Sequence, residues 1–152
     1  MIFWLRLAGR GKDGEGMQPI KKREIQGTNE DVVARVKRFI DLSMAGDPAS
    51  QAFLAPNVQI TFTGGRRFTA PEEIGAFNAT RYRWVKKKIT GFDVAPAGGE
   101  TVVYCHGTLY GEWPDGTPFD GNRFVDRLVF VDGRITRIDV WNDSAERLLE
   151  RR

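Results

Sequence analysis

Two ionisable residues in the C-terminal half of this 152-residue chain, His106 and Asp126, could together transfer a proton. A carboxyl group among apolar side chains resists ionisation and can act as an acid, and a neighbouring histidine can act as a base. Phe124 and Leu128 flank Asp126 at a spacing of two residues. The sequence therefore predicts a catalytic pair, Asp126 and His106, if both residues face one cavity.

Further polar residues recur in steps of two, the spacing that places side chains on one face of a strand. If those faces point inward, they form a polar floor for a small ligand, with two more aromatic residues at its mouth. The residues expected to contact the ligand on this basis are Tyr104, Tyr110, Asn122 and Asn142, with Tyr82 and Trp84 at the mouth.

Structural explanations for the same residues remain open. A histidine on an inward strand face is more often a hydrogen-bonded core residue than a catalyst. Asp126 could serve only to bond Asn122, His106 or a backbone amide. Tyrosine rings, apolar with one polar end, suit the walls of a cavity whether or not it is catalytic. The same pocket could thus bind a ligand without converting it.

No motif in the sequence predicts a cofactor. The glycine pairs at 64–65 and 98–99 lack the spacing of a nucleotide-binding loop. One cysteine and one histidine are too few for a structural zinc site, so we expect neither a metal nor another cofactor.

Composition narrows the class of protein. Hydrophobic residues make up 41% of the chain and charged residues 28%, as in ordinary globular domains. The net charge of +3 is too small to predict nucleic-acid binding, and the basic run at 81–88 is interpreted as a solvated face. The single cysteine fits a reducing compartment, and no apolar run is long enough to span a membrane. We expect a cytoplasmic protein.

Local signals divide the chain into a flexible N-terminal extension, residues 1–27, and one domain, residues 28–152. Thr28 and Asp31 have the spacing of a capping box, and Gly46 is a suitable helix end. Asp47 and Pro48 predict the start of a short second helix, and Pro71 predicts the start of a third. The predicted strands are 58–62, 86–94, 101–113, 119–131 and 134–142, and 146–152 is a predicted helical tail.

Helices followed by a run of antiparallel strands indicate the α+β class. The long strands are apolar on both faces, so a second subunit is the simplest cover for the outer face. The residues assigned to that face are Val103, Leu109, Val125, Val129 and Trp141, together with Cys105, Trp113 and an ion-pair cluster of Arg127, Arg137 and Asp139. We therefore predict a homodimer through the outer sheet face.

Four segments, residues 39–47, 53–58, 126–135 and 140–143, resemble the SnoaL-like branch of the nuclear-transport-factor-2-like superfamily. The resemblance implies a curved antiparallel sheet wrapped around the N-terminal helices, a cone with a central pocket, also called a cystatin-like α+β barrel. It also implies a homodimer and a small hydrophobic or polyketide-like ligand. The superfamily contains enzymes and binding proteins alike, so the fold does not decide the function.

Positions carried over from ketosteroid isomerase, a member of that superfamily, match in one case of three. Its first-helix tyrosine falls on Phe39, and its general base falls on Thr61 or Phe62. Its protonated aspartic acid falls on Asp126. The isomerisation by that mechanism is therefore not expected here. The resemblance leaves Asp126 as the one retained functional group, and Phe39 and Phe62 are expected to contact the ligand.

Limonene epoxide hydrolase, another member, uses an arginine between two aspartates, and the matching positions are His106, Thr108 and Val140. That reaction is not expected here. The sequence predicts a small-molecule pocket protein, either a cofactor-free isomerase or lyase of the dehydratase or cyclase type using Asp126 and His106, or a non-catalytic binding or accessory module.

Overall fold

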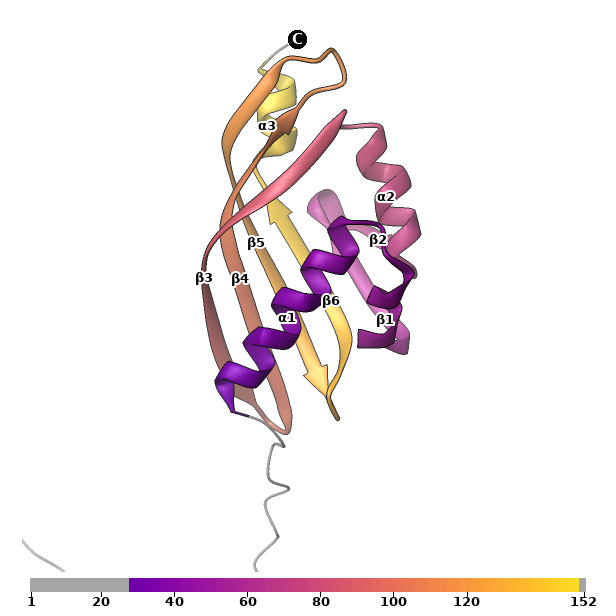
Figure 1. Ribbon diagram of the computed structural model, residues 1–152, viewed down its shortest axis with the longest axis vertical. Coiled ribbons are helices and arrows are strands. Elements are labelled where there is room, and N and C mark those ends of the chain that lie inside the picture. The colour runs from indigo at the N-terminus through magenta and orange to yellow at the C-terminus, as the bar shows by residue number, and fades with distance from the viewer. Residues whose placement is uncertain (1–27, 151–152) are drawn as a thin grey trace, which may run out of the picture.

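The computed structural model describes residues 28–150, and the expected N-terminal extension, residues 1–27, lies outside them. Three α-helices, two short 3-10 helices and six strands make up this part of the chain (Figure 1). In chain order they are α1 (Asn29–Met44), η1 (Pro48–Phe53), β1 (Leu54–Phe62), η2 (Thr63–Gly65), β2 (Arg66–Phe68), α2 (Pro71–Ala79), β3 (Trp84–Ala97), β4 (Glu100–Glu112), β5 (Pro118–Val131), β6 (Arg134–Asn142) and α3 (Ser144–Leu149).

All six strands form one curved, open sheet in the order β2-β1-β6-β5-β4-β3, and α1 lies across its concave face (Figure 1). The α+β class predicted from the sequence is confirmed. Strands β3 to β6 pair antiparallel with their neighbours, whereas β1 pairs parallel with β6. The short strand β2, absent from the sequence prediction, pairs with β1 and ends the sheet opposite β3.

The predicted capping box begins α1. Thr28 Oγ1 accepts a hydrogen bond from the Asp31 amide at 3.2 Å, and the Asp31 carboxylate accepts one from the Thr28 amide at 2.8 Å. The helix ends before Gly46, whose φ of +69° is the left-handed conformation that glycine adopts without strain. Its buried face, which includes Phe39 and Ile40, is thereby held against the sheet.

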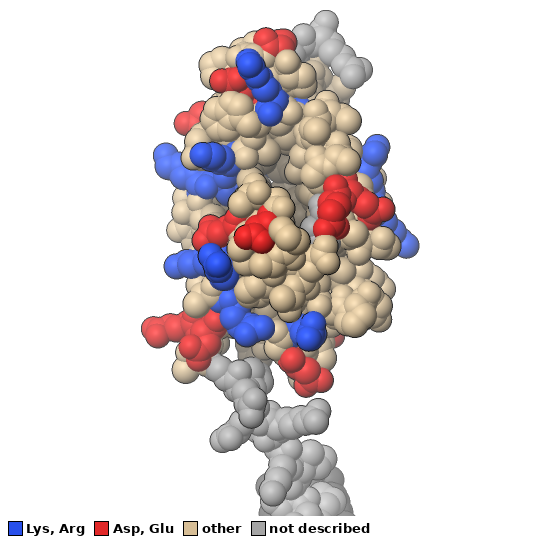
Figure 2. Space-filling view, turned by 45° about the vertical axis from the view of Figure 1, so that its right-hand side comes forward, with Lys and Arg blue, Asp and Glu red and all other residues tan. Residues whose placement is uncertain are grey.

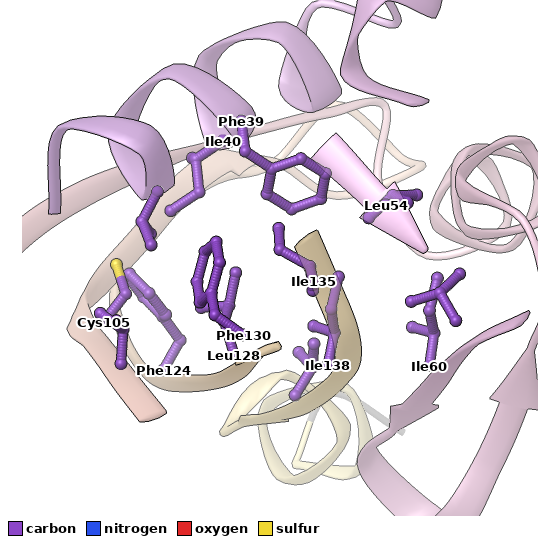
Figure 3. Packing of buried hydrophobic residues seen from close by; sticks show 14 of the residues in the cluster. Phe39, Ile40, Leu54, Ile60, Cys105, Phe124, Leu128, Phe130, Ile135 and Ile138 are labelled. Atoms are coloured by element: carbon purple, nitrogen blue, oxygen red, sulfur yellow. The ribbon is translucent and has the colours of Figure 1, made fainter. Parts of the chain in front are cut away.

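The concave face of the sheet and the buried face of α1 share one hydrophobic core (Figure 3). On β4 the residues in this core are Val103, Cys105 and Leu109, for which the sequence pattern predicts the outer face. That assignment is wrong, because their aliphatic and thiol side chains fill the space beneath α1. Alternation along the strand then places Tyr104, His106 and Tyr110 on the convex face.

On the convex face the predicted ion-pair cluster is confirmed. Asp139 accepts from Arg127 at 3.2 Å and from Arg137 at 2.9 Å. Val125 and Trp141, paired across β5 and β6, are 38% and 51% exposed.

Two other residues assigned to this face are buried. Val129 lies opposite Arg137 of the ion-pair cluster, on the convex side as predicted, but is only 4% exposed, and Trp113 is buried in a stack on Phe119. Trp113 therefore cannot serve as a dimer contact. No helix among residues 28–150 is long and apolar enough to cross a membrane.

Candidate functional site

A pocket of about 100 Å³ lies between α1, α2 and the concave side of the sheet. Apolar side chains form most of its wall. Its polar lining residues are Ser43, Asn78, Tyr82, Lys87, Asp126 and Asn142. Figure 2 brings forward the α2 side of the molecule and shows that this face is hollowed between groups of acidic side chains. The cavity lies where the sequence predicts a central pocket, and its wall has few polar groups among apolar ones.

A lysine and an aspartate meet in this wall. The Lys87 ammonium donates a hydrogen bond to Asp126 Oδ2, and the two side chains are only 16% and 7% exposed. Lys87 Nζ also lies 4.5 Å from the centroid of the Phe124 ring, within the range of a cation–π contact. The pair is therefore shielded from water on several sides, where its electrostatic attraction is stronger than at the surface.

Close packing of β3 on β4 brings these two residues together across an intervening strand. Lys87 belongs to β3 and Asp126 to β5, with β4 between them. Two glycines of β4 let β3 coil tightly over it. A Cβ at Gly107 would overlap the carbonyl oxygen of Lys88, and one at Gly111 would overlap that of Trp84. Only glycine permits this approach, and the resulting curvature carries Lys87 toward Asp126.

The second carboxylate oxygen, Asp126 Oδ1, is buried and has no hydrogen-bond partner among residues 28–150. Leaving a buried acceptor unpaired is costly, and such atoms in native proteins call for a specific explanation. Asp126 belongs to the pocket wall, so a bound molecule with an O–H or N–H group could satisfy this atom. The Tyr82 hydroxyl, in the same wall, is likewise buried without a hydrogen-bond partner among these residues, so the cavity offers two unpaired oxygens.

Five of the sequence-predicted site residues line this pocket: Asp126, Asn142, Tyr82, Phe62 and Phe39. Asn122 is not among the lining residues; it is buried and donates to Ser144 Oγ at 3.3 Å. Burial raises the pKa of the Tyr82 phenol above its usual range.

His106 does not face the cavity, so the expectation that it shares a cone with Asp126 is wrong. Its ring is 40% exposed on the convex face, with Nδ1 3.2 Å from Thr90 Oγ1 and Nε2 3.4 Å from Asp93 Oδ2. The strand register explains the error: Cys105 is opposite Asp126, whereas His106 is opposite the outward-facing Val125. Directly paired residues share a side of the sheet. Tyr104 is on the convex side with His106 and contacts no part of the pocket.

Lys87 is the residue that sequence reasoning missed. It stands in a basic run that was interpreted as a solvated face, and its neighbours Lys86 and Lys88 are indeed exposed. Strand alternation was the available signal, because Val85, Lys87 and Ile89 fall on one side in steps of two. A lysine flanked in this way by apolar residues is on the buried face of its strand.

A second, open groove of about 690 Å³ lies between the C-terminal part of α1 and strand β3. Trp84 and Tyr110, two of the predicted ligand contacts, line this groove rather than the central pocket. The groove and the pocket have four lining residues in common: Ile40, Met44, Val85 and Lys87. Lys87 therefore stands where the two spaces meet.

Cys105 adjoins the Lys87–Asp126 pair but is an unreactive neighbour. Burial raises the pKa of its thiol to about 12; Lys87 opposes this shift and Asp126 adds to it. A thiol that stays protonated at neutral pH is a poor nucleophile. Within residues 28–150 no group of three or more histidine, cysteine or acidic side chains is arranged to hold a metal ion.

No family model matches the sequence, and no curated protein matches it. Solved structures do match. An NTF2-like protein of unknown function from Burkholderia pseudomallei superposes with a TM-score of 0.61 at 22% identity, covering 77% of this chain and 94% of that one. A protein assigned as a SnoaL-like polyketide cyclase, from Jannaschia, gives a TM-score of 0.58 at 18% identity and coverages of 89% and 95%.

TerC, crystallised with polyporic acid, gives a TM-score of 0.55 at 20% identity and coverages of 74% and 95%. Matches at these identities reflect the path of the backbone rather than a common activity. The chain therefore has the nuclear-transport-factor-2-like fold, which it shares with SnoaL-like proteins.

Proposed function

We propose that this protein binds a small, mainly apolar molecule in the cone, with one oxygen-bearing group of that molecule against Lys87 and Asp126. The unpaired Asp126 Oδ1 carries the proposal, because a buried acceptor in a pocket wall favours a ligand that donates a hydrogen bond to it. Lys87 supplies the complementary donor from the same wall. TerC shares this fold and was crystallised with polyporic acid, which supports small-molecule binding as a use of such a cone.

The same pair suits a cofactor-free proton transfer next to a carbonyl group, the step needed by an isomerase or by a lyase of the dehydratase or cyclase type. The Asp126 carboxylate would accept the proton, and the Lys87 ammonium would stabilise negative charge that develops on the carbonyl oxygen. Lys87 replaces His106 in this scheme, because the histidine lies on the other face. A non-catalytic binding module with the same pocket is the second candidate.

Binding is tested by calorimetric titration with 2-naphthalenemethanol, an aromatic alcohol whose hydroxyl can donate to Asp126 and whose rings can extend past Lys87 into the adjoining groove. We expect saturable binding that weakens at least about fivefold in Asn78→Trp, which fills the pocket from α2, and in Asp126→Asn. Arg137→Gln, on the convex face, is the matched control and should bind as the wild type does. Equal binding by all three variants would refute a ligand site in the cone.

Catalysis is tested separately by following the α-protons of 2-indanone in D₂O by NMR. An active Lys87–Asp126 pair accelerates their exchange, and Asp126→Asn should lose about 10²-fold or more of that rate. Binding of 2-naphthalenemethanol without any accelerated exchange would support the binding module instead.

We also propose that two copies associate through the convex face, at the exposed Val125 and Trp141. Neighbouring large apolar side chains on an open sheet face are commonly covered by a partner. A cytoplasmic location remains a proposal that rests on the single buried thiol, Cys105, which suits a reducing compartment.

A further inference from the structure

We infer that Lys87 is a nucleophile that forms a covalent imine with an apolar aldehyde or ketone bound in the cone. The inference rests on the proposed function only in needing a ligand in that pocket. It goes further by naming the reacting atom, Lys87 Nζ, and the functional group of the substrate.

Three consecutive lysines provide the first observation. Lys86 and Lys88 are exposed on the outer side of β3, whereas the Lys87 side chain is 16% exposed and lines the pocket. Its amine lies over the Phe124 ring, and apolar residues, including Leu109 and Ile40, line the same wall. Lysines that form Schiff bases are found at apolar walls of this kind, where the amine meets a bound carbonyl group away from bulk water.

The Asp126 carboxylate provides the second observation, because imine formation needs a group that both accepts and returns protons. Nζ donates its hydrogen bond directly to Oδ2, so this oxygen is placed to take one proton from the ammonium as the substrate carbonyl arrives. The amine lone pair is then free to attack. Oδ1, unpaired among the described residues, gives the carboxyl a second atom through which protons can pass.

Imine formation needs only these two groups and the carbonyl compound, and it releases one water molecule. The Lys87 nitrogen attacks the carbonyl carbon while the Asp126 acid gives its proton to the carbonyl oxygen, and the carboxylate then removes a proton from nitrogen to leave a neutral carbinolamine. Asp126 returns this proton to the hydroxyl group, water leaves, and the nitrogen lone pair forms the C=N bond. The product is an iminium ion beside the Asp126 carboxylate, with no net oxidation or reduction.

The shape of the site restricts the substrate. The pocket of about 100 Å³ accepts a small apolar group next to the carbonyl. The groove of about 690 Å³ begins at the same lysine and offers Trp84 and Tyr110 to an aromatic or aliphatic extension. A carbonyl carbon at Lys87 would thus connect a small group inside the cone with a larger one outside it.

Reductive trapping tests the inference on the whole protein. The protein is incubated with 2-naphthaldehyde and sodium cyanoborohydride at neutral pH, and the modified lysines are located by peptide mass spectrometry. We expect Lys87 to be labelled at least about tenfold faster than Lys88, its exposed neighbour, and Lys87→Arg to lose the fast labelling while keeping its fold by circular dichroism. Labelling of Lys87 at or below the rate of Lys88 would overturn the inference.

The alcohol probe separates this outcome from failure of the proposed function. 2-Naphthalenemethanol has the shape of the aldehyde but cannot form an imine. If the alcohol binds in the cone and Lys87 is not trapped, binding stands and the imine is refuted. If the alcohol does not bind and Lys87 is not trapped, both are refuted. Fast trapping of Lys87 that saturates with aldehyde concentration supports both.

Discussion

Two buried aspartates on opposite faces of the same sheet differ in how completely they are satisfied. Asp139, on the convex face, is only 5% exposed in its side chain and receives hydrogen bonds on both oxygens, from the guanidinium groups of Arg127 and Arg137. Asp126, on the concave face, receives one ammonium on Oδ2 and nothing on Oδ1 from residues 28–150. Both are buried carboxylates, but only Asp126 has an oxygen that is free to accept a hydrogen bond from a ligand.

The difference is informative about function. A fully bonded carboxylate such as Asp139 has its burial cost offset within the fold, so a structural role accounts for it. Asp126 has a hydrogen bond on only one of its two oxygens, so part of the free-energy cost of burying its charge is not offset. Its unpaired oxygen lies in the wall of a cavity. Burial alone therefore does not distinguish the two acids, whereas the unpaired oxygen of Asp126 at a pocket wall supports the proposed ligand contact.

The largest expected effect is on stability when Asp126 loses its charge. Asp126→Leu leaves the Lys87 ammonium buried without a partner and should cost about 3–5 kcal/mol of unfolding free energy in urea denaturation. The double variant Lys87→Met, Asp126→Leu should recover most of that loss, because both charges are then gone. A double variant no more stable than the single one would show that the ion pair is not the cause.

Trp141→Glu tests the exposed part of the convex face. A charge there should weaken association of two copies by about 2 kcal/mol or more, as expected for a central aromatic contact, while binding in the cone is unchanged. The measurement is light scattering after size exclusion over a range of protein concentrations. Arg38→Glu, on the exposed side of α1, is the control. If Trp141→Glu forms dimers as readily as Arg38→Glu does, the convex face is not the interface.

Asp139→Leu should cost less than Asp126→Leu, about 1–2 kcal/mol, although Asp139 has more hydrogen bonds. Arg137 and, in part, Arg127 reach solvent, so water can take over their donors when the carboxylate is removed. Titration with 2-naphthalenemethanol should be unaltered. A cost as large as that of Asp126→Leu, or lost binding, would erase the contrast between the two faces.

The pH dependence of stability that comes from the Cys105 thiol tests whether the concave face is shielded from water. Its pKa of about 12 in the folded protein exceeds the ordinary value of 9.0, so the native state holds the thiol proton more tightly than the unfolded chain does. That contribution is complete below pH 9 and is lost as pH rises from 9 toward 12. The stability advantage of the wild type over Cys105→Ala should therefore shrink by about 1 kcal/mol between pH 8 and pH 10, measured by urea unfolding. A constant difference would mean that the thiol is not desolvated.

Much of the fold was predictable because its signals are local. The capping box at Thr28, the Asp47–Pro48 helix start and the long strands all depend on residues close in sequence, and each is present. The face of β4 was not predictable in this way. Both of its faces carry apolar residues, and only the register that sets Cys105 against Asp126 decides which face is inward.

The candidate site was half predictable for the same reason. Asp126 stands between Phe124 and Leu128, a clear apolar face, and the structure places it in the pocket as expected. Its partner comes from β3, two strands away in the sheet, and no short-range pattern joins the two. The partner chosen from the sequence was the only histidine, whereas the sheet's curvature supplied a lysine.

The smallest expected effect belongs to His106, and it decides whether the two faces have been assigned correctly. His106→Gln keeps a side chain that can hydrogen-bond Thr90 and removes only an exposed, weak contact with Asp93. Surface changes of this kind alter stability by no more than about 0.5 kcal/mol. Because the imidazole and the pocket are on opposite sides of β4, the titration with 2-naphthalenemethanol and the exchange of 2-indanone protons should both match the wild type. Asp126→Asn, one strand away on the concave side, should change both under the same conditions. If His106→Gln instead reduced exchange while Asp126→Asn did not, the active face would be the convex one, and the contrast between Asp126 and Asp139 would have no functional meaning.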